Sequence, residues 1–120
     1  MKTLTIQKYK IAPWKNVLSL PASARILTVR SEHKETWDYE LQAHLKEDEA
    51  FVWVMLDPNE ERIPRTFYLW PTDKDFQVED PDMLVYVGTF QLGDSVKMVF
   101  HVFTNRVFTS KLIGQPGVQG

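Results

Sequence analysis

The sequence contains no cysteine, and none of its five glycines lies in the spacing of a phosphate-binding loop. The missing thiols exclude a disulfide framework, thiolate metal ligands and a cysteine nucleophile. Because nothing in this composition calls for an oxidising compartment, we expect a cytoplasmic protein. No segment approaches the ~18 apolar residues of a membrane-spanning helix, and residues 1–10 lack the apolar core of a signal peptide. No membrane is expected among the partners.

Sequence patterns that carry chemistry are equally scarce. There is no GxSxG or SxxK nucleophile motif. The three histidines, His33, His44 and His101, have no second ligand at a metal-binding spacing. We therefore expect no metal, no cofactor and no catalytic residue, and a non-enzymatic protein is favoured over an enzyme.

The chain has the composition of one ordinary globular domain, with 120 residues, 43% of them hydrophobic, and a net charge of −2. The expected domain spans residues 1–113, and residues 114–120 (GQPGVQG) are expected to form a flexible tail.

Charge is unevenly distributed along the chain. Residues 1–30 carry six lysines and arginines and no acid, whereas residues 31–82 carry fifteen acids and five bases. Either the basic segment binds a polyanion, with Tyr9 and Trp14 as stacking partners, or it neutralises acidic strands within a sheet. The second interpretation is favoured because the whole chain is mildly acidic, so nucleic acid is not the expected partner.

The strongest local pattern is a β-hairpin over residues 84–103. Two runs rich in β-branched and aromatic residues, 84–90 and 96–103, flank residues 91–95, which contain Gly93-Asp94. Both runs are apolar at almost every position, so we expect both faces of the hairpin to be covered. The predicted core includes six residues from this hairpin and from the apolar run 50–56: Val54, Leu56, Val85, Val87, Val99 and Phe100.

The rest of the chain is typical of further short strands. Residues 50–56 (AFVWVML) are predicted to be a central strand with Trp53 in the core, and residues 65–70 a strand that ends at Pro71. In the first strand the apolar positions change parity after Ile6, which predicts a β-bulge near residues 7–8. Seven or eight such strands predict a mostly-β single domain: a rolled antiparallel sheet or small sandwich with at most one or two short helices.

Residues 35–45 are ambiguous. Trp37, Tyr39 and Leu41 belong to a strict alternation of apolar and polar residues, which is typical of a half-buried strand. Trp37, Leu41 and Leu45 are also spaced for one face of a helix, and several neighbouring residues favour helices. We favour the strand, followed by an acidic turn at residues 46–49.

Polar residues of the hairpin define a candidate ligand-binding site. Thr89 and Gln91 share one strand face, and His101 lies on the other arm within about two residue pairs of them. Arg65, on the preceding strand, would supply the charge for an anion. The alternative, in which the three hairpin side chains satisfy one another and the backbone in the core, is somewhat favoured.

Two of the four tryptophans, Trp14 and Trp70, lie beside prolines at strand ends, where we expect exposed interface anchors. The runs 50–56 and 99–103 carry more apolar surface than a small one-sheet domain covers from one side. We therefore expect a homodimer or a larger assembly.

Five segments, in this order, resemble a family of small proteins encoded in phage genomes and prophage-like regions: TIQKYKI, LSLPASARILTV, FVWVMLDP, PRTFYLW and YVGTFQLGDSVKMVFHVF. The similarity covers most of residues 3–103 and is most specific in the last segment. Residues 34–49 look like an insertion relative to that family, and residues 72–75 stand where its members tend to carry a Gly-Thr-Gly-His turn. The family has no assigned activity, so the resemblance implies a phage or mobile-element accessory protein, in the host cytoplasm, and no mechanism.

This setting and the missing catalytic motifs together predict a non-enzymatic protein that binds a host protein or a small anionic signal molecule. Its expected role is counter-defence or host takeover. Two alternatives stand beside it: a small hydrolytic enzyme that uses His101, and a nucleic-acid binder that uses residues 1–30.

Overall fold

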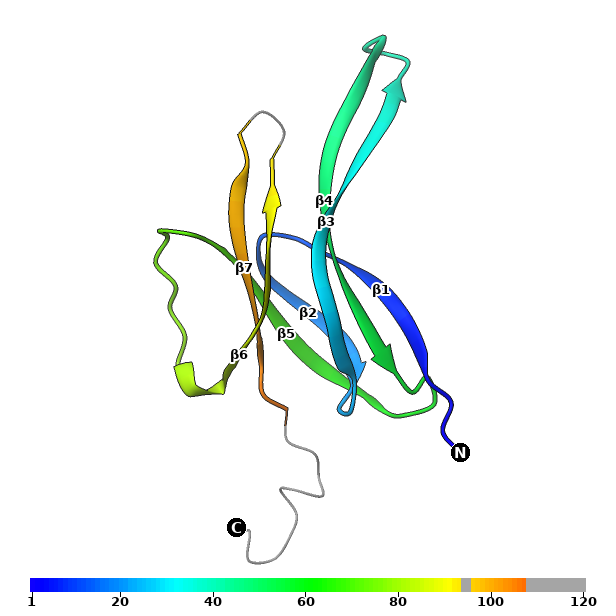
Figure 1. The fold of residues 1–120 in the computed structure, drawn as a ribbon, viewed down its shortest axis with the longest axis vertical. Coiled ribbons are helices and arrows are strands. Elements are labelled where there is room, and N and C mark those ends of the chain that lie inside the picture. The colour runs from blue at the N-terminus through cyan, green and yellow to red at the C-terminus, as the bar shows by residue number, and fades with distance from the viewer. Residues whose placement is uncertain (94–95, 108–120) are drawn as a thin grey trace, which may run out of the picture.

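The computed structural model describes residues 1–93 and 96–107, which form seven β-strands and one short 3-10 helix (Figure 1). In chain order the elements are β1 (Thr5–Ile11), β2 (Trp14–Pro21), β3 (Arg25–Asp38), β4 (Ala43–Leu56), β5 (Arg62–Pro71), η1 (Pro81–Met83), β6 (Leu84–Leu92) and β7 (Met98–Asn105). They make two antiparallel sheets, ordered β1-β4-β3 and β2-β5-β7-β6. The predicted mostly-β fold is confirmed, whereas the expected tail at residues 114–120 lies outside the described residues. Within the described ranges, no helix is long and apolar enough to cross a membrane.

The predicted central strand, residues 50–56, is the inner end of β4, which lies between β1 and β3. Its residues alternate between buried and half-buried positions, as a strand packed on one side requires. Val52 and Val54 face the core, but Trp53 points to the outer face and is half-buried. The prediction that Trp53 lies in the core is therefore wrong.

β6 and β7 form the predicted hairpin, but only part of it is covered on both faces. Of the predicted core residues in it, Phe100 is buried, Val87 and Val99 are half-buried, and Val85 is 37% exposed. Val85 is exposed because β6 is an edge strand and Val85 lies near the start of that strand. The two predicted core residues of β4, Val54 and Leu56, are buried.

The core lies between the inner faces of the two sheets. Val29 and Val52 from one sheet and Phe67 and Val102 from the other belong to a single buried apolar cluster. The sheets come close together at Gly88 of β6, where an added Cβ would lie 2.8 Å from Val29 Cγ2. Glycine is needed there for the close approach of β6 to β3.

The ambiguous segment 35–45 is the tip of a hairpin, not one continuous strand. β3 ends at Asp38 and β4 begins at Ala43. Asp38 Oδ1 accepts hydrogen bonds from the backbone N–H groups of Glu40 and Leu41 at 2.9 and 3.0 Å, and Gln42 has a positive φ of 53°. The predicted acidic turn at residues 46–49 is wrong, because these residues continue β4.

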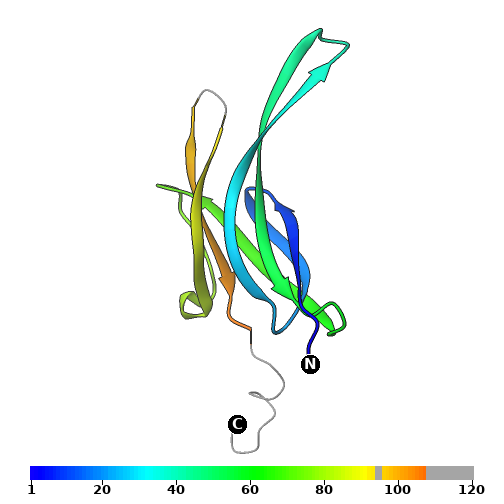
Figure 2. The same ribbon diagram turned by 45° about the vertical axis from the view of Figure 1, so that its right-hand side comes forward.

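The outer part of this hairpin, residues 32–49, projects beyond the rest of the chain, and we call it the arm (Figures 1 and 2). Tyr39 and Leu41 at its tip are 80% and 65% exposed. The strand expected over residues 35–45 is confirmed at its two ends, in β3 up to Asp38 and in β4 from Ala43, whereas residues 39–42 form a turn. The expected half-burial is wrong, because most of the alternating apolar side chains are exposed.

The predicted bulge in β1 is also absent, since β1 pairs with β4 in continuous register from Thr5 to Ile11. Ile6 simply faces outward. Bulges occur instead in β3, between Ile26 and Thr28, and in β6, between Tyr86 and Gly88.

Candidate functional site

The outer face of the four-stranded sheet carries an aromatic hollow. Phe67 and Leu69 of β5 point into the core, so the alternate residues Tyr68 and Trp70 point away from it. Trp14, at the start of β2, packs edge to face on Trp70 with ring centroids 4.7 Å apart. A hollow of about 650 Å³ lies against these three rings, and we call it the aromatic hollow.

The opposite wall of the aromatic hollow is built by the segment between β5 and β6, residues 72–83, which we call the strap (Figure 1). Phe76 of the strap lies 4.8 Å from Trp70 and 5.4 Å from Tyr68, measured between ring centroids. The Trp70 indole donates a 2.7 Å hydrogen bond from Nε1 to the Asp75 carbonyl oxygen. Trp70 is thereby held by the strap on one side and by Trp14 on the other.

Backbone hydrogen bonds fix the strap at both ends. Thr72 N donates to Val99 O at 3.2 Å, and Arg106 N donates to Met83 O at 2.7 Å. Charged side chains of both signs line the hollow between these ends: Lys15, Glu79, Asp80 and Arg106. An apolar floor with a rim of mixed charge is the composition of a protein-recognition site.

Trp14 is held in an unusual backbone conformation. Its φ is +81°, a region that bulky residues rarely occupy and that costs about 1–3 kcal/mol. The side chain is nevertheless 49% exposed, so burial of the ring does not explain the conformation. Such outliers concentrate at binding sites, and this one sets a tryptophan at the edge of the aromatic hollow.

The predicted hairpin residues form a chain of polar contacts on the same outer face. Thr89 and His101 are directly opposite in the β6–β7 register, with Thr89 Oγ1 3.3 Å from His101 Nδ1. His101 Nε2 lies 2.7 Å from Thr72 Oγ1 of the strap, and Tyr86 Oη contacts Thr89 Oγ1. Gln91 is exposed one residue pair further along this face.

The fourth predicted residue, Arg65, does not join them. It lies on the inner side of β5, in line with Phe67, whereas Trp70 is the β5 residue that pairs with His101. Arg65 Nη1 donates a 3.1 Å hydrogen bond to the Ala24 carbonyl oxygen. Arg65 and His101 lie on neighbouring strands, as the sequence suggests. They nevertheless point to opposite faces of the sheet, Arg65 to the inner face and His101 to the outer face.

Sequence reasoning missed Thr72 and Phe76, which complete the site from the strap. Residues 72–82 contain five acids and one lysine, a composition typical of a solvated connection between strands. Phe76 is the one aromatic residue in that segment, and an aromatic residue among acids was the available signal that the segment packs on the sheet.

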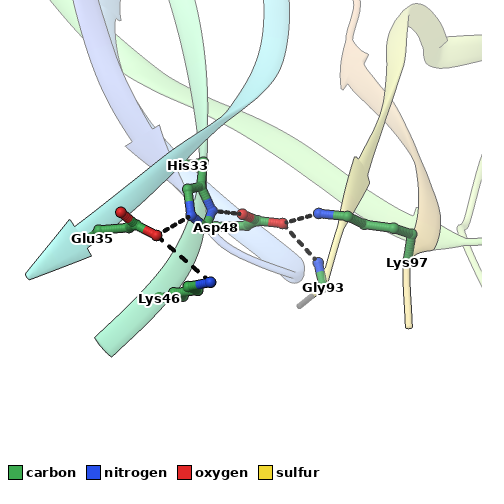
Figure 3. A network of polar contacts seen from close by, with 6 residues as sticks. All are labelled: His33, Glu35, Lys46, Asp48, Gly93 and Lys97. Atoms are coloured by element: carbon green, nitrogen blue, oxygen red, sulfur yellow. Dashed lines mark hydrogen bonds and ion pairs between the residues drawn. The ribbon is translucent and has the colours of Figure 1, made fainter. Parts of the chain in front are cut away.

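A second polar network joins the arm to the β6–β7 hairpin (Figure 3). The Asp48 side chain is 7% exposed and accepts hydrogen bonds from Lys97 Nζ at 2.7 Å and Gly93 N at 3.2 Å. Its other oxygen lies 2.9 Å from His33 Nδ1. Hydrogen bonds from Lys97 and His33 lower the pKa of Asp48 from 3.8 to about 2, and the bond with Asp48 raises the pKa of His33.

His101 is in contact with the hydroxyl groups of Thr72 and Thr89. Within residues 1–93 and 96–107, no group of three His, Asp or Glu side chains could hold a metal ion. The aromatic hollow has one exposed ring, that of Trp14, and three half-buried rings, those of Tyr68, Trp70 and Phe76.

Comparison with protein families identified one match. A family model described as "Domain of unknown function (DUF7352)" matches residues 2–111. Comparison with curated proteins and with solved structures gave no match.

Proposed function

The chain belongs to the DUF7352 family of domains of unknown function, and on that premise we propose that it is a non-enzymatic accessory protein that binds a partner protein at the aromatic hollow. We place it in a phage or mobile element, with a host protein as the partner and counter-defence or host takeover as the role. That setting rests on the sequence resemblance alone.

The observation that carries the proposal is Trp14, which is half exposed at the edge of the hollow and held at a strained φ. Tryptophan is enriched among the residues that dominate protein–protein binding energy. Trp70 and Phe76 behind it are fixed by the strap, so the site needs little ordering when a partner binds. The mixed charges of Lys15, Glu79, Asp80 and Arg106 suit a peptide segment with an apolar side chain and charged neighbours.

The test is affinity capture from a lysate of the host with three tagged proteins: the parent chain, Trp14→Ala and Trp37→Ala. Trp37, on the arm, is 43% exposed and serves as a matched control for Trp14. We expect Trp14→Ala to lose the captured protein and Trp37→Ala to retain it. With the purified partner, Trp14→Ala should weaken binding by roughly 2 kcal/mol, about thirtyfold in Kd.

Loss of the partner with Trp37→Ala alone would move the site to the arm. Retention by both variants would refute the aromatic hollow as the binding site. Thermal melts of the three proteins exclude misfolding as the cause of any loss.

A small anionic ligand at Thr89, Gln91 and His101 is the second candidate. The exposed positions of Thr89 and Gln91 favour it, whereas both ring nitrogens of His101 already contact threonine hydroxyl groups. If binding of the anion is undiminished in His101→Phe, this second candidate is wrong. Turnover of a substrate that is lost in His101→Ala, with the fold intact, would instead support a hydrolytic enzyme.

Binding to nucleic acid has less support, because Lys8 and Lys10 of the basic segment already pair with Glu32 and Glu49. An affinity for DNA or RNA that falls steeply with salt would reverse this ranking. Self-association as a homodimer or larger remains part of the proposal, and sedimentation that finds only a 14.0 kDa species would contradict it.

A further inference from the structure

Arg65 lines a second hollow, which lies on the other side of β5 from the aromatic hollow. Its volume is about 320 Å³, within the lower range of small-molecule sites. Its walls are Ala24 with residues 25–27 of β3 and residues 85–87 of β6, so each sheet contributes one strand. We call it the inter-sheet hollow.

Both walls of the inter-sheet hollow carry a β-bulge at this place. The register shifts between Ile26 and Thr28 in β3 and between Tyr86 and Gly88 in β6. Bulges bend a strand locally and occur frequently beside binding sites. Here both bulges lie near Gly88 and Val29, where the same two strands are in close contact.

The guanidinium of Arg65 is only partly satisfied. Nη1 donates to Ala24 O, whereas Nε is buried and has no hydrogen-bond partner among the described residues. Nε and Nη2 form one of the two edges with which arginine grips an oxyanion, and a ligand reaches this edge by displacing the side chains that cover Nε.

No ion pair of this guanidinium is formed within residues 1–93 and 96–107. The described residues that line the inter-sheet hollow include a second cation, Arg25, and no aspartate or glutamate. Burial lowers the pKa of Arg65, the direction expected for a desolvated cation without a counter-charge.

We propose that the inter-sheet hollow is a binding site for a small organic anion, whose carboxylate or phosphate group is held by the Nε–Nη2 edge of Arg65. Arg25 adds a second positive charge at the wall. The apolar side chains of Ile26, Leu27, Val85 and Val87 surround the rest of the hollow, so the ligand carries an apolar body beside its charge. This site is separate from the aromatic hollow and does not depend on the partner protein proposed there.

The test follows the Arg65 Nε–H resonance of the ¹⁵N-labelled full chain by nuclear magnetic resonance during titration. The probes are hexanoate and butyl phosphate, and hexanamide is the neutral control. We expect both anions to shift this resonance saturably in the millimolar range, and hexanamide to have no such effect. Arg65→Lys should weaken anion binding about ten- to hundredfold, because a lysine keeps the charge but lacks the planar guanidinium group. Binding to this variant is measured through the backbone amide resonances of β3 and β6.

Arg62→Lys is the matched control, since Arg62 lies on the same strand but donates to Tyr9 Oη and Ser19 O outside this hollow. It should bind both anions as the parent chain does. The proposal is overturned if neither anion shifts the Arg65 resonance, if hexanamide binds equally well, or if Arg62→Lys and Arg65→Lys weaken binding equally. Arg65→Met, checked by its melting temperature, provides a second variant that should abolish binding.

Discussion

The two sheets turn similar aromatic residues outward and cover them in opposite ways. On the three-stranded sheet, Lys8 Nζ lies 4.1 Å from the ring centroid of Phe51, and the Arg30 guanidinium lies 4.7 Å from that of Trp53. On the four-stranded sheet, the rings contact one another and leave the aromatic hollow open. On the first face the aromatic rings are covered by cations of the same sheet, whereas on the second they line an open hollow, where we propose that a partner binds.

Ion pairs complete the closure of the three-stranded sheet. Lys8 and Lys10 of β1 reach Glu32 and Glu49 at 2.7 and 2.6 Å. The hydrogen bond between Lys10 and Glu49 raises the pKa of the lysine and lowers that of the glutamate. The number of aromatic residues on a face therefore does not by itself indicate a binding surface. The side chains that cover those aromatic residues have to be compared as well.

The largest expected effect on the free energy of unfolding concerns the core that lies between the inner faces of the two sheets. Phe67→Ala should destabilise the protein by about 3–5 kcal/mol, because Phe67 is fully buried between the sheets and its loss leaves a cavity. Phe76→Ala, on the strap, should cost only about 1 kcal/mol from its aromatic contacts. Urea unfolding measures both, and equal losses would mean that the strap belongs to the core.

The next effect tests how closely the sheets must approach. Gly88→Ala should cost about 1–3 kcal/mol, because its Cβ would lie 2.8 Å from Val29 Cγ2. Adding Val29→Ala removes the clashing methyl group, so the double variant should lose less than the sum of the two single changes. Strict additivity in urea unfolding would contradict a direct contact between β6 and β3.

Much of this architecture could be predicted from the sequence because strand patterns are local. The β6–β7 hairpin and the central position of residues 50–56 followed from apolar runs and turn residues. The arm did not, because its turn uses Asp38 as a side-chain cap and contains no glycine or proline, so the alternation runs through it unbroken. The same pattern misled for Ile6, since an outward apolar residue on a solvated face imitates a bulge.

The candidate site was predictable only in part, for a related reason. Thr89 and His101 meet because they oppose each other within one hairpin. Arg65 is separated from them because successive residues of β5 point to opposite faces of the sheet. Thr72 and Phe76 contribute because the strap packs against the outer face of the same sheet. Neither property is written in a short sequence pattern.

A smaller effect concerns the polar link between the arm and the β6–β7 hairpin (Figure 3). The lowered pKa of Asp48 means that its contribution is present above its unfolded value of 3.8 and is lost as pH falls toward 2. The raised pKa of His33 means that its contribution is present below its unfolded value of 6.5 and is lost as pH rises through the folded value. The link should therefore be strongest between these two unfolded values.

Thermal melts from about pH 2.5 to 8 measure this dependence. Asp48→Asn should flatten the acid side of the profile and also the neutral side, because both depend on the carboxylate. His33→Gln should flatten the neutral side and reduce the acid side without removing it, because Lys97 still lowers the pKa of Asp48. A profile for Asp48→Asn that matches the parent chain would show that the network contributes nothing to stability.

The smallest effect compares the outer faces of the two sheets directly, through two double-mutant cycles. In the three-stranded sheet, Arg30→Gln and Trp53→Leu should show a coupling of about 0.5–1 kcal/mol at low salt. In the four-stranded sheet, Trp14→Leu and Trp70→Leu should show a coupling of about 0.5–1.5 kcal/mol. Repeating both cycles in 1 M salt, where the screening length is about 3 Å, should reduce the first coupling and leave the second unchanged. If salt reduces both couplings equally, the two faces are covered by the same kind of interaction. The proposal that a partner binds the four-stranded sheet because its aromatic rings are uncovered would then be wrong.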